Sequence, residues 1–200
     1  MAAITGTIGS DTFYGSLNGD SYEGAGGSDQ LNFAQTGTNL DVNFVEGWVR
    51  DMDDQSRFNT FANLQSFFGG WGDDRVLGNQ YDNTIRGEGG DDIIEGGLGM
   101  DFLNGGAGED TASYASASAG VTVSLAITTV QNTGVTGMDS LTGFENLKGS
   151  AFADTLTGDA GDNLIEGGAG ADKLYGGLGF DGVSYANASD AVQVNLNAGT

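Results

Sequence analysis

Residues 69–113 read GGWGDDRVL, GNQYDNTIR, GEGGDDIIE, GGLGMDFLN and GGAGEDTAS, five consecutive nine-residue units that share one pattern. The same frame returns at 6–32 as three units and at 149–184 as four units. The first position is Gly in all twelve units, and the sixth is Asp in ten and Asn in two, Asn83 and Asn163. The eighth position is apolar throughout: Phe13, Tyr22, Leu31, Val76, Ile85, Ile94, Leu103, Ala112, Leu156, Ile165, Leu174 and Val183. A fixed period with an acid and a hydrophobe at constant offsets predicts a repeat architecture and a ligand together.

Each unit is expected to form a turn followed by a short strand. The first six positions suit a turn, because Gly adopts positive φ and lets backbones approach closely. The last three positions suit a brief strand whose middle residue, the eighth, points inward. One inward residue per unit cannot form a core alone. Two units would therefore form a coil, and coils would stack on one another as in a solenoid.

The composition excludes several classes of partner. The chain carries 28 acidic residues against six basic ones, with no His and no Cys, for a formal net charge of −22. No surface of such a chain could neutralise a run of phosphates, so we expect no nucleic acid and no anionic membrane as a partner. Without cysteine there is no disulfide and no thiolate metal site. No stretch approaches the roughly 20 apolar residues of a membrane span, so we expect no membrane insertion.

High acidity is also typical of disordered chains. Here, however, the acids recur at one position of the repeat, which favours a folded, ligand-bound state. We expect disorder only for the chain without its ligand.

The repeats resemble the glycine- and aspartate-rich nonapeptides, GGxGxDxUx with U apolar, of the RTX family of haemolysin-type calcium-binding repeats. The twelve units cover 108 of the 200 residues. The resemblance implies an all-β fold, a right-handed parallel β-roll or β-solenoid with connecting β segments, that binds Ca²⁺ in its turns. It also implies a secreted, extracellular bacterial protein with the type I secretion machinery as a partner. The first residues, MAAITGTIGSD, hold no N-terminal signal peptide, as expected for a family whose export signal is C-terminal.

Calcium prefers six to eight oxygen ligands from carboxylates and backbone carbonyls, and a GGxGxD turn offers both. In the family, a site lies between one turn and the turn two units later. Carried over to this chain, the resemblance implies about six calcium ions, between Asp11 and Asp29, Asp74 and Asp92, Asn83 and Asp101, Asp92 and Asp110, Asp154 and Asp172, and Asn163 and Asp181. Asp20 would have a partner only if a connecting segment supplies one. The turn glycines that would complete the sites are Gly70, Gly72, Gly87, Gly90, Gly97, Gly99, Gly105, Gly108, Gly168, Gly170, Gly177 and Gly179. Asn83 and Asn163 lack a charge, so we expect their sites to be weaker.

We expect one solenoid domain over residues 1–200. Its calcium arrays, 6–32, 69–113 and 149–184, are followed by connecting β segments at 33–68, 114–148 and 185–200, the last incomplete. Each segment begins with alternating apolar residues typical of half-buried strands: Leu40, Val42 and Phe44; Val121, Val123 and Leu125; Val192, Val194 and Leu196. We also align Phe61-Ala62-Asn63-Leu64 with Phe144-Glu145-Asn146-Leu147, because each stretch shortly precedes an array.

Nothing in the sequence favours an enzyme. Ser and Thr are plentiful, but without His or Cys no ordinary nucleophile–base arrangement is available. The acid pairs Asp73-Asp74 and Asp91-Asp92 fall inside repeat turns. The glycine-rich loops lack the GKS/T sequence of a phosphate-binding loop.

Residues 46–58 form the least repeat-like stretch and hold Trp48 and two of the six basic residues. One interpretation makes this stretch a contact surface for a polysaccharide or a cell-surface partner, with Trp48 and Trp71 as stacking platforms. The other makes it a surface loop whose aromatic side chains pack back on the roll.

The sequence thus predicts an extracellular calcium-binding module that folds on Ca²⁺ after secretion into a rigid rod. Two alternatives stay open. The chain could be a structural or adhesive cell-surface protein that self-assembles with calcium. It could also be the C-terminal tail of a secreted hydrolase or toxin whose catalytic domain is absent.

Overall fold

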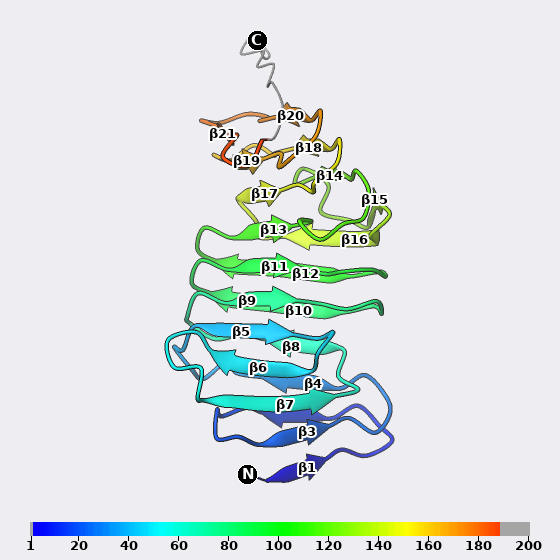
Figure 1. Ribbon diagram of the computed structural model, residues 1–200, viewed down its shortest axis with the longest axis vertical. Coiled ribbons are helices and arrows are strands. Elements are labelled where there is room, and N and C mark those ends of the chain that lie inside the picture. The colour runs from blue at the N-terminus through cyan, green and yellow to red at the C-terminus, as the bar shows by residue number, and fades with distance from the viewer. Residues whose placement is uncertain (1, 189–200) are drawn as a thin grey trace.

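The computed structural model describes residues 2–188 and shows short strands stacked into a parallel β-roll (Figure 1). Strands β1 to β21 make up all of its regular secondary structure, and residues 2–188 contain no helix. Nearly all neighbouring strands are parallel. The predicted all-β parallel roll is confirmed. The strand expected at Val192, Val194 and Leu196 lies outside the described residues. No helix among residues 2–188 is long and apolar enough to cross a membrane.

One side of the roll is an 11-stranded sheet with the order β1-β3-β7-β6-β5-β9-β11-β13-β17-β19-β21. Its strands are β1 (Ala3–Thr5), β3 (Ser21–Glu23), β5 (Leu40–Asn43), β6 (Trp48–Asp51), β7 (Phe58–Ala62), β9 (Arg75–Leu77), β11 (Ile93–Glu95), β13 (Thr111–Ser113), β17 (Asn146–Lys148), β19 (Leu164–Glu166) and β21 (Gly182–Ser184).

The other side consists of a 7-stranded sheet, β15-β16-β12-β10-β8-β4-β2, followed by a 3-stranded sheet, β14-β18-β20. Their strands are β2 (Thr12–Tyr14), β4 (Gln30–Asn32), β8 (Ser66–Phe68), β10 (Thr84–Gly89), β12 (Phe102–Ala107), β14 (Thr122–Ser124), β15 (Gln131–Gly134), β16 (Gly137–Thr142), β18 (Thr155–Thr157) and β20 (Lys173–Tyr175).

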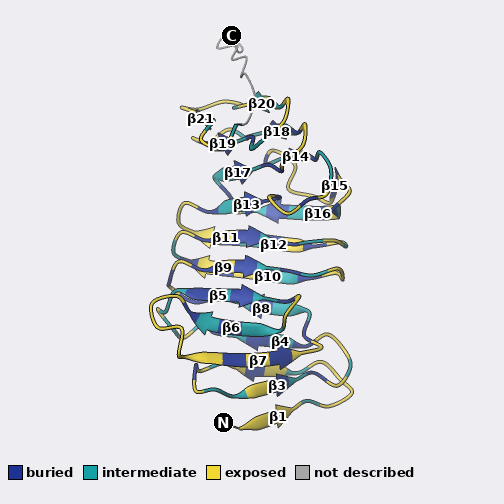
Figure 2. Ribbon diagram, in the orientation of Figure 1, coloured by how far each residue is buried: buried dark blue, intermediate teal, exposed yellow. Residues whose placement is uncertain are grey.

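A column of eighth-position side chains runs through the core, which also includes apolar residues of the connecting segments. Figure 2 shows buried residues along the strands throughout the stack. The strand register stacks the eighth-position side chains in line: Ile85 pairs with Leu103, and Ile94 pairs with Ala112. Ten of the twelve are buried, whereas in the last coils Leu174 is half-buried and Val183 is 38% exposed. Full burial of a Leu or Ile side chain contributes roughly 1.5–3 kcal/mol. No coil holds more than two of these residues, so the core exists only through stacking.

Both connecting segments add strands to the sheets built by the arrays. In the first segment, β6 pairs antiparallel with β5 and with β7, and β5 pairs in parallel with β9. In the second, β15 pairs antiparallel with β16, and β14 pairs in parallel with β18. Leu40, Val42 and Phe44 are buried, as the alternation of apolar residues indicates.

The predicted alignment of Phe61 with Phe144 and of Leu64 with Leu147 is wrong by three residues. Phe67 of β8 pairs with Leu31, and Leu147 of β17 pairs with Ala112, so Phe67 and Leu147 both follow the last eighth position of an array. Leu64 therefore corresponds to Phe144, and both are buried. The error arose from matching Phe-Ala-Asn-Leu with Phe-Glu-Asn-Leu by their letters, whereas Leu64 and Phe144 each lie five residues before an array. The units that contain them have six residues, 63–68 and 143–148, and lack the first three positions of a full unit.

Residues 134–142, GVTGMDSLT, form a thirteenth unit that the sequence analysis missed. Leu141 pairs with Leu103, one eighth position with another. Gly134, Gly137 and Asp139 stand at the first, fourth and sixth positions of this unit. The signal was present in the sequence, but the unit stands outside every continuous array.

Candidate metal sites

Hydrogen bonds run along the roll from one sixth-position residue to the next. In each predicted pair, the main-chain N–H of the earlier residue donates to Oδ1 of the carboxylate 18 residues later. The N···O distances are 2.9 Å for Asp11 to Asp29, 2.7 Å for Asp74 to Asp92, 2.8 Å for Asn83 to Asp101, 2.8 Å for Asp92 to Asp110, 3.0 Å for Asp154 to Asp172 and 3.1 Å for Asn163 to Asp181. The structure thus brings together the members of all six pairs.

The other side-chain oxygen of the sixth residue lies against the first-position Gly of its own unit. A Cβ built on Gly87 would overlap Asp92 Oδ2 and also the carbonyl oxygen of Gly105, the first residue of the turn 18 residues later. The same two kinds of oxygen lie under 3.0 Å from the Cβ position at four other glycines: Gly69 (Asp74 and Gly87), Gly78 (Asn83 and Gly96), Gly149 (Asp154 and Gly167) and Gly158 (Asn163 and Gly176). A side chain at these positions would fill the space between the oxygens.

The gap between two stacked turns is called a rung below. In five of the six predicted pairs, all except Asp11 with Asp29, the rung therefore brings three oxygens together. In the rung between Asp92 and Asp110, they are Asp92 Oδ2, the carbonyl oxygen of Gly105 and Asp110 Oδ1. Calcium binds carboxylate and carbonyl oxygens at about 2.3–2.6 Å. In each of these rungs the side-chain oxygen and the carbonyl oxygen both lie under 3.0 Å from the Cβ position built on the first glycine. Both oxygens can therefore bind the same ion, and the donor set of a rung fits calcium.

The inward carboxylate oxygens are buried without a donor. Asp29, Asp74, Asp92, Asp101 and Asp110 are all at most 2% exposed, and the Oδ2 atom of each has no hydrogen-bond partner. A buried acceptor without a donor costs about 1–3 kcal/mol, and more when it is charged. A carboxylate and a carbonyl that face each other in this way need a cation or a proton between them.

Burial also raises the pKa of these carboxyl groups. The pKa of Asp74 rises to about 8, those of Asp92 and Asp101 to about 7, and that of Asp110 to about 6, chiefly because burial penalises the charged form. The main-chain N–H donors lower these pKa values in part, and neighbouring acids raise them further. Folding without a cation therefore shifts these carboxyl groups towards their protonated form, most strongly at Asp74.

Asn83 and Asn163 occupy equivalent places, each above a six-residue unit. Asn83 Nδ2 donates to the carbonyl oxygen of Gln65 at 3.3 Å, and Asn163 Nδ2 donates to that of Glu145 at 2.8 Å. The side-chain amide thus donates to the carbonyl oxygen 18 residues earlier, which a carboxylate could not do. On its later side, each Asn presents Oδ1 to the next carbonyl, as an Asp would.

The twelve predicted glycines stand at the first, second or fourth position of their units. The carbonyls of Gly87 and Gly105 lie in the rungs. The fourth-position glycines let turns stack closely, since a Cβ on Gly90 or Gly108 would overlap backbone atoms of the preceding turn. Eight have positive φ: Gly90, Gly97, Gly99, Gly108, Gly168, Gly170, Gly177 and Gly179. The carbonyls of Gly70 and Gly99 accept main-chain N–H groups instead. Sequence reasoning missed the rung carbonyls of Gly96, Gly167 and Gly176, although an invariant first-position Gly was the available signal.

Asp20 has a partner from a connecting segment. Its main-chain N–H donates to Asn59 Oδ1 at 2.9 Å, in the geometry of the other pairs. Asn59 is fully buried and neutral. This rung therefore offers fewer charged oxygens than those inside the arrays.

Fifth-position acids form a second, outer series of hydrogen bonds that the sequence analysis did not anticipate. Asp73 Oδ1 accepts the N–H of Asp91 at 2.9 Å, and Asp82 Oδ1 accepts that of Met100 at 2.8 Å. In the acid pair Asp73-Asp74, Asp74 accepts the N–H of Leu40 from the preceding coil, whereas Asp73 accepts the N–H of Asp91 from the following coil. Across residues 2–188, no three acidic side chains form a single metal-binding group. Backbone carbonyls are therefore essential to any calcium site here.

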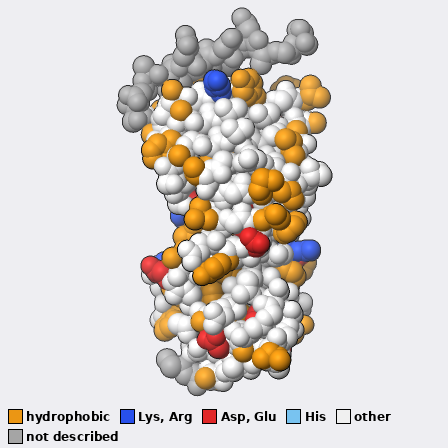
Figure 3. Space-filling view, turned by 90° about the vertical axis from the view of Figure 1, so that its right-hand side faces the viewer, with side chains coloured by type: hydrophobic (Ala, Val, Ile, Leu, Met, Phe, Trp, Pro, Cys, Tyr) orange, Lys and Arg blue, Asp and Glu red, His pale blue; other side chains and the backbone are white. Residues whose placement is uncertain are grey.

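The surface reflects this arrangement. Few acidic side chains reach the face shown in Figure 3, whereas apolar side chains are spread along it. The sixth-position acids contribute little to the surface because most of them are buried in the turns.

The two tryptophans differ in their surroundings. The guanidinium carbon of Arg50 lies 4.2 Å from the centre of the Trp48 ring, and Trp48 Nε1 donates to Glu46 at 2.6 Å. One face of Trp48 is therefore covered by a residue of its own strand, β6, and Phe58 is 40% exposed, so residues 46–58 are not a surface loop whose aromatic side chains pack back on the roll. Trp71 is 75% exposed.

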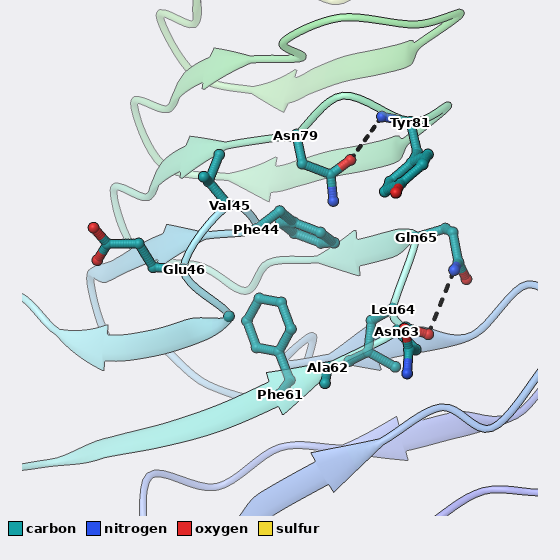
Figure 4. A pocket seen from close by; sticks show the side chains of 11 residues that line it. Phe44, Val45, Glu46, Phe61, Ala62, Asn63, Leu64, Gln65, Asn79 and Tyr81 are labelled. Atoms are coloured by element: carbon teal, nitrogen blue, oxygen red, sulfur yellow. Dashed lines mark hydrogen bonds between the residues drawn. The ribbon is translucent and has the colours of Figure 1, made fainter.

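A pocket lies beside the turn that joins β5 and β6 (Figure 4). The rings of Phe44 and Phe61 meet edge to face in it, 5.0 Å apart, and Tyr81 lies at its other side. Glu46 is its one ionisable group besides the Tyr81 phenol. Its lining is otherwise apolar or amide.

Comparison with known protein families identifies the repeats. The family model for the RTX calcium-binding nonapeptide repeat matches four stretches, residues 3–31, 68–103, 99–113 and 148–183, which together span more than half of the chain. The stretches 32–67 and 114–147 fall outside the matches. No curated protein matches the chain.

Proposed function

This chain belongs to the RTX family of calcium-binding nonapeptide repeats, and we propose that calcium folds it, outside the cell, into a rigid rod. It is a calcium-binding repeat module with an all-β parallel fold. The rod is proposed to hold about six ions, one in each of the six predicted pairs, and to have no catalytic role of its own.

The observation that carries this proposal is the set of buried carboxylate oxygens without donors. Asp74 and Asp92 each direct such an oxygen at a first-position glycine, Gly69 and Gly87, that can hold no side chain there. A bound divalent cation supplies the missing positive charge. In its absence, adjacent turns would bring carboxylates and carbonyls together uncompensated.

The net charge of the whole chain supports the same proposal. A formal net charge of −22 opposes compaction, and six divalent ions would remove more than half of it. Each array coil buries at most two eighth-position side chains to offset this repulsion. We therefore expect the chain to be unfolded where calcium is scarce and folded where it is abundant.

Such a switch would suit export. An unfolded acidic chain in the low-calcium cytosol is fit for threading through the type I secretion machinery, and external calcium would then fold it. The rod could space or stabilise a catalytic or toxin domain attached to it. It could also be the product itself, a surface protein that assembles through its ends or binds a polysaccharide through Trp71.

Circular dichroism and light scattering of the full chain test the proposal. In excess chelator we expect a spectrum without β structure, and in millimolar Ca²⁺ a cooperative gain of β signal without growth in particle size. A β-rich spectrum in chelator that calcium leaves unchanged would overturn the folding switch. Particles that grow as the chain folds would favour the self-assembling surface protein over the isolated module.

A further inference from the structure

The two six-residue units, 63–68 and 143–148, share one backbone conformation. Asn63 and Gly143 open these units with φ values of 54° and 62°. Asn63 is one of only two non-glycine residues among 2–188 with positive φ. The next residues, Leu64 and Phe144, are both buried. A shared left-handed residue in two otherwise different sequences indicates a shared requirement on the backbone.

That conformation places a carbonyl where a full unit places its first-position carbonyl. A Cβ built on Gly24 would overlap both Asp29 Oδ2 and the carbonyl oxygen of Asn63. A Cβ built on Gly105 would overlap the carboxyl group of Asp110 and the carbonyl oxygen of Gly143. Within the arrays, the same overlap involves Asp92 Oδ2 and the carbonyl of Gly105. The short units therefore reproduce this part of a rung without its first three residues.

The side chain of the third residue completes the set. Gln65 Oε1 accepts the N–H of Asp29 at 3.0 Å, and Glu145 Oε2 accepts the N–H of Asp110 at 2.9 Å. These bonds match those between sixth-position residues inside the arrays. Meanwhile Asp29 Oδ2 and Asp110 Oδ2 are buried and have no hydrogen-bond partner among residues 2–188. Asp29 Oδ2 lies beside the carbonyl oxygen of Asn63, and the carboxyl group of Asp110 lies beside that of Gly143.

From this geometry we propose that each short unit completes one further calcium site, at Asp29 with Asn63 and Gln65 and at Asp110 with Gly143 and Glu145. The inference rests on the proposed calcium binding of the arrays and adds two sites to their six. The site at Asp110 has two carboxylates and the site at Asp29 has one. Since charge count tunes calcium affinity, the site at Asp110 is the tighter of the two.

The rung between Asp101 and Asp139, where the thirteenth unit follows the second array, differs from these two. Asp139 Oδ1 accepts the N–H of Asp101 at 3.3 Å, but its Oδ2 accepts the hydroxyl groups of Tyr114 and Thr133 at 3.1 and 3.0 Å. A Cβ built on Gly96 would overlap only atoms of Asp101, so no carbonyl oxygen is placed beside Asp101 Oδ2 as it is in the other rungs. No calcium site is assigned to this rung.

Crystals of the full chain grown in Ca²⁺, with anomalous scattering recorded from the ions, test the assignment directly. We expect ions in the six array rungs and one more at each short unit. Ions in the arrays, with none beside the carbonyls of Asn63 and Gly143, would overturn this inference and leave the proposed function standing. No ions in the arrays would overturn both.

Reciprocal substitutions test it in solution by Ca²⁺ titration calorimetry. Glu145→Gln should weaken one site on the order of tenfold, and Gln65→Glu should tighten another by a similar factor. The matched controls are Glu109→Gln and Gln80→Glu, which make the same charge changes at exposed positions. Because Gln65→Glu gains affinity, a folding defect cannot imitate its effect. Affinities that follow net charge alone, equal for variant and control, would overturn the assignment.

Discussion

A Cβ on Gly87 would occupy the space that Asp92 Oδ2 takes, so the glycine and the carboxylate five residues later depend on each other. Gly87→Ala should displace the carboxylate or the Gly105 carbonyl and weaken the Asp92–Asp110 site. We expect a loss of about 1–3 kcal/mol in calcium-loaded stability, the usual cost of overpacking, measured by denaturant unfolding at fixed free Ca²⁺.

The matched control is Gly26→Ala. A Cβ on Gly26 would have its nearest neighbour at 3.7 Å, an ordinary contact. This variant should remain within about 0.5 kcal/mol of the parent chain. Equal losses in the two variants would show that glycine content, and not the carboxylate cradle, explains the effect.

The metal-free chain should fold more readily as the pH falls. The pKa of Asp74 is raised to about 8 and those of Asp92 and Asp101 to about 7, against an ordinary value near 4 in an unfolded chain. The folded state therefore binds more protons, and its stability increases as the pH falls through 8 to 6 and levels off below about 4. Circular dichroism in chelator should show more β structure at pH 5 than at pH 8.5.

Calcium affinity should change in the opposite direction. Protons compete with the ion for the same carboxylates, so the Ca²⁺ midpoint should rise as the pH is lowered from 8 to 6. Asp74→Asn should lose part of both pH effects. A midpoint that does not move over this range would contradict the assignment of these carboxylates as ligands.

Asn163→Asp should make the fold more dependent on calcium. The substitution removes the donor that reaches the carbonyl of Glu145 at 2.8 Å and leaves two acceptors facing each other. We expect metal-free stability to fall by about 1–3 kcal/mol and calcium affinity to rise. Asn18→Asp, at an exposed turn position, is the control for the added charge. Higher stability of Asn163→Asp in chelator would contradict the role of the amide.

Asn63 and Gly143 should be interchangeable, because both adopt positive φ at equivalent places. Asn63→Gly should be nearly neutral apart from the hydrogen bond of Asn63 Nδ2 to Glu23 at 2.5 Å. Asn63→Val should lose about 1–2 kcal/mol, since a left-handed conformation is costly for a β-branched residue. Thermal unfolding in saturating Ca²⁺ measures both, and a neutral Asn63→Val would refute the backbone requirement.

Much of the fold follows from the nine-residue frame alone. The frame predicts which residues point inward and which sixth-position residues meet 18 residues later, because both follow from position in a regular coil. Asp92 and Asp110 could be paired in this way without coordinates. The parallel architecture was predictable for the same reason.

The connecting segments were harder to predict, because their units are incomplete. The units at 63–68 and 143–148 lack three positions and do not read as nonapeptides, and matching them by like letters displaced Leu64 from Phe144. The antiparallel strand β6 has no period at all, and its pairing with β5 and β7 depends on a reversal that no repeat position encodes. The donors to Asp139, Tyr114 and Thr133, are brought together only by the fold.

The inserted strands determine the path of the long axis. Between β7 and β9, one side of the roll contains β6 and β5, while β8 and β10 are direct neighbours on the other side. Two strands add about 9–10 Å of height on one side only, which tilts the coils that follow. The second segment places β15 and β14 on the opposite side, between β16 and β18. The array between the two insertions has five units, and this odd number is what transfers the second insertion to the other side. The two tilts therefore oppose each other. With an even number of units in that array, both insertions would lie on one side of the roll, and successive arrays would bend into an arc.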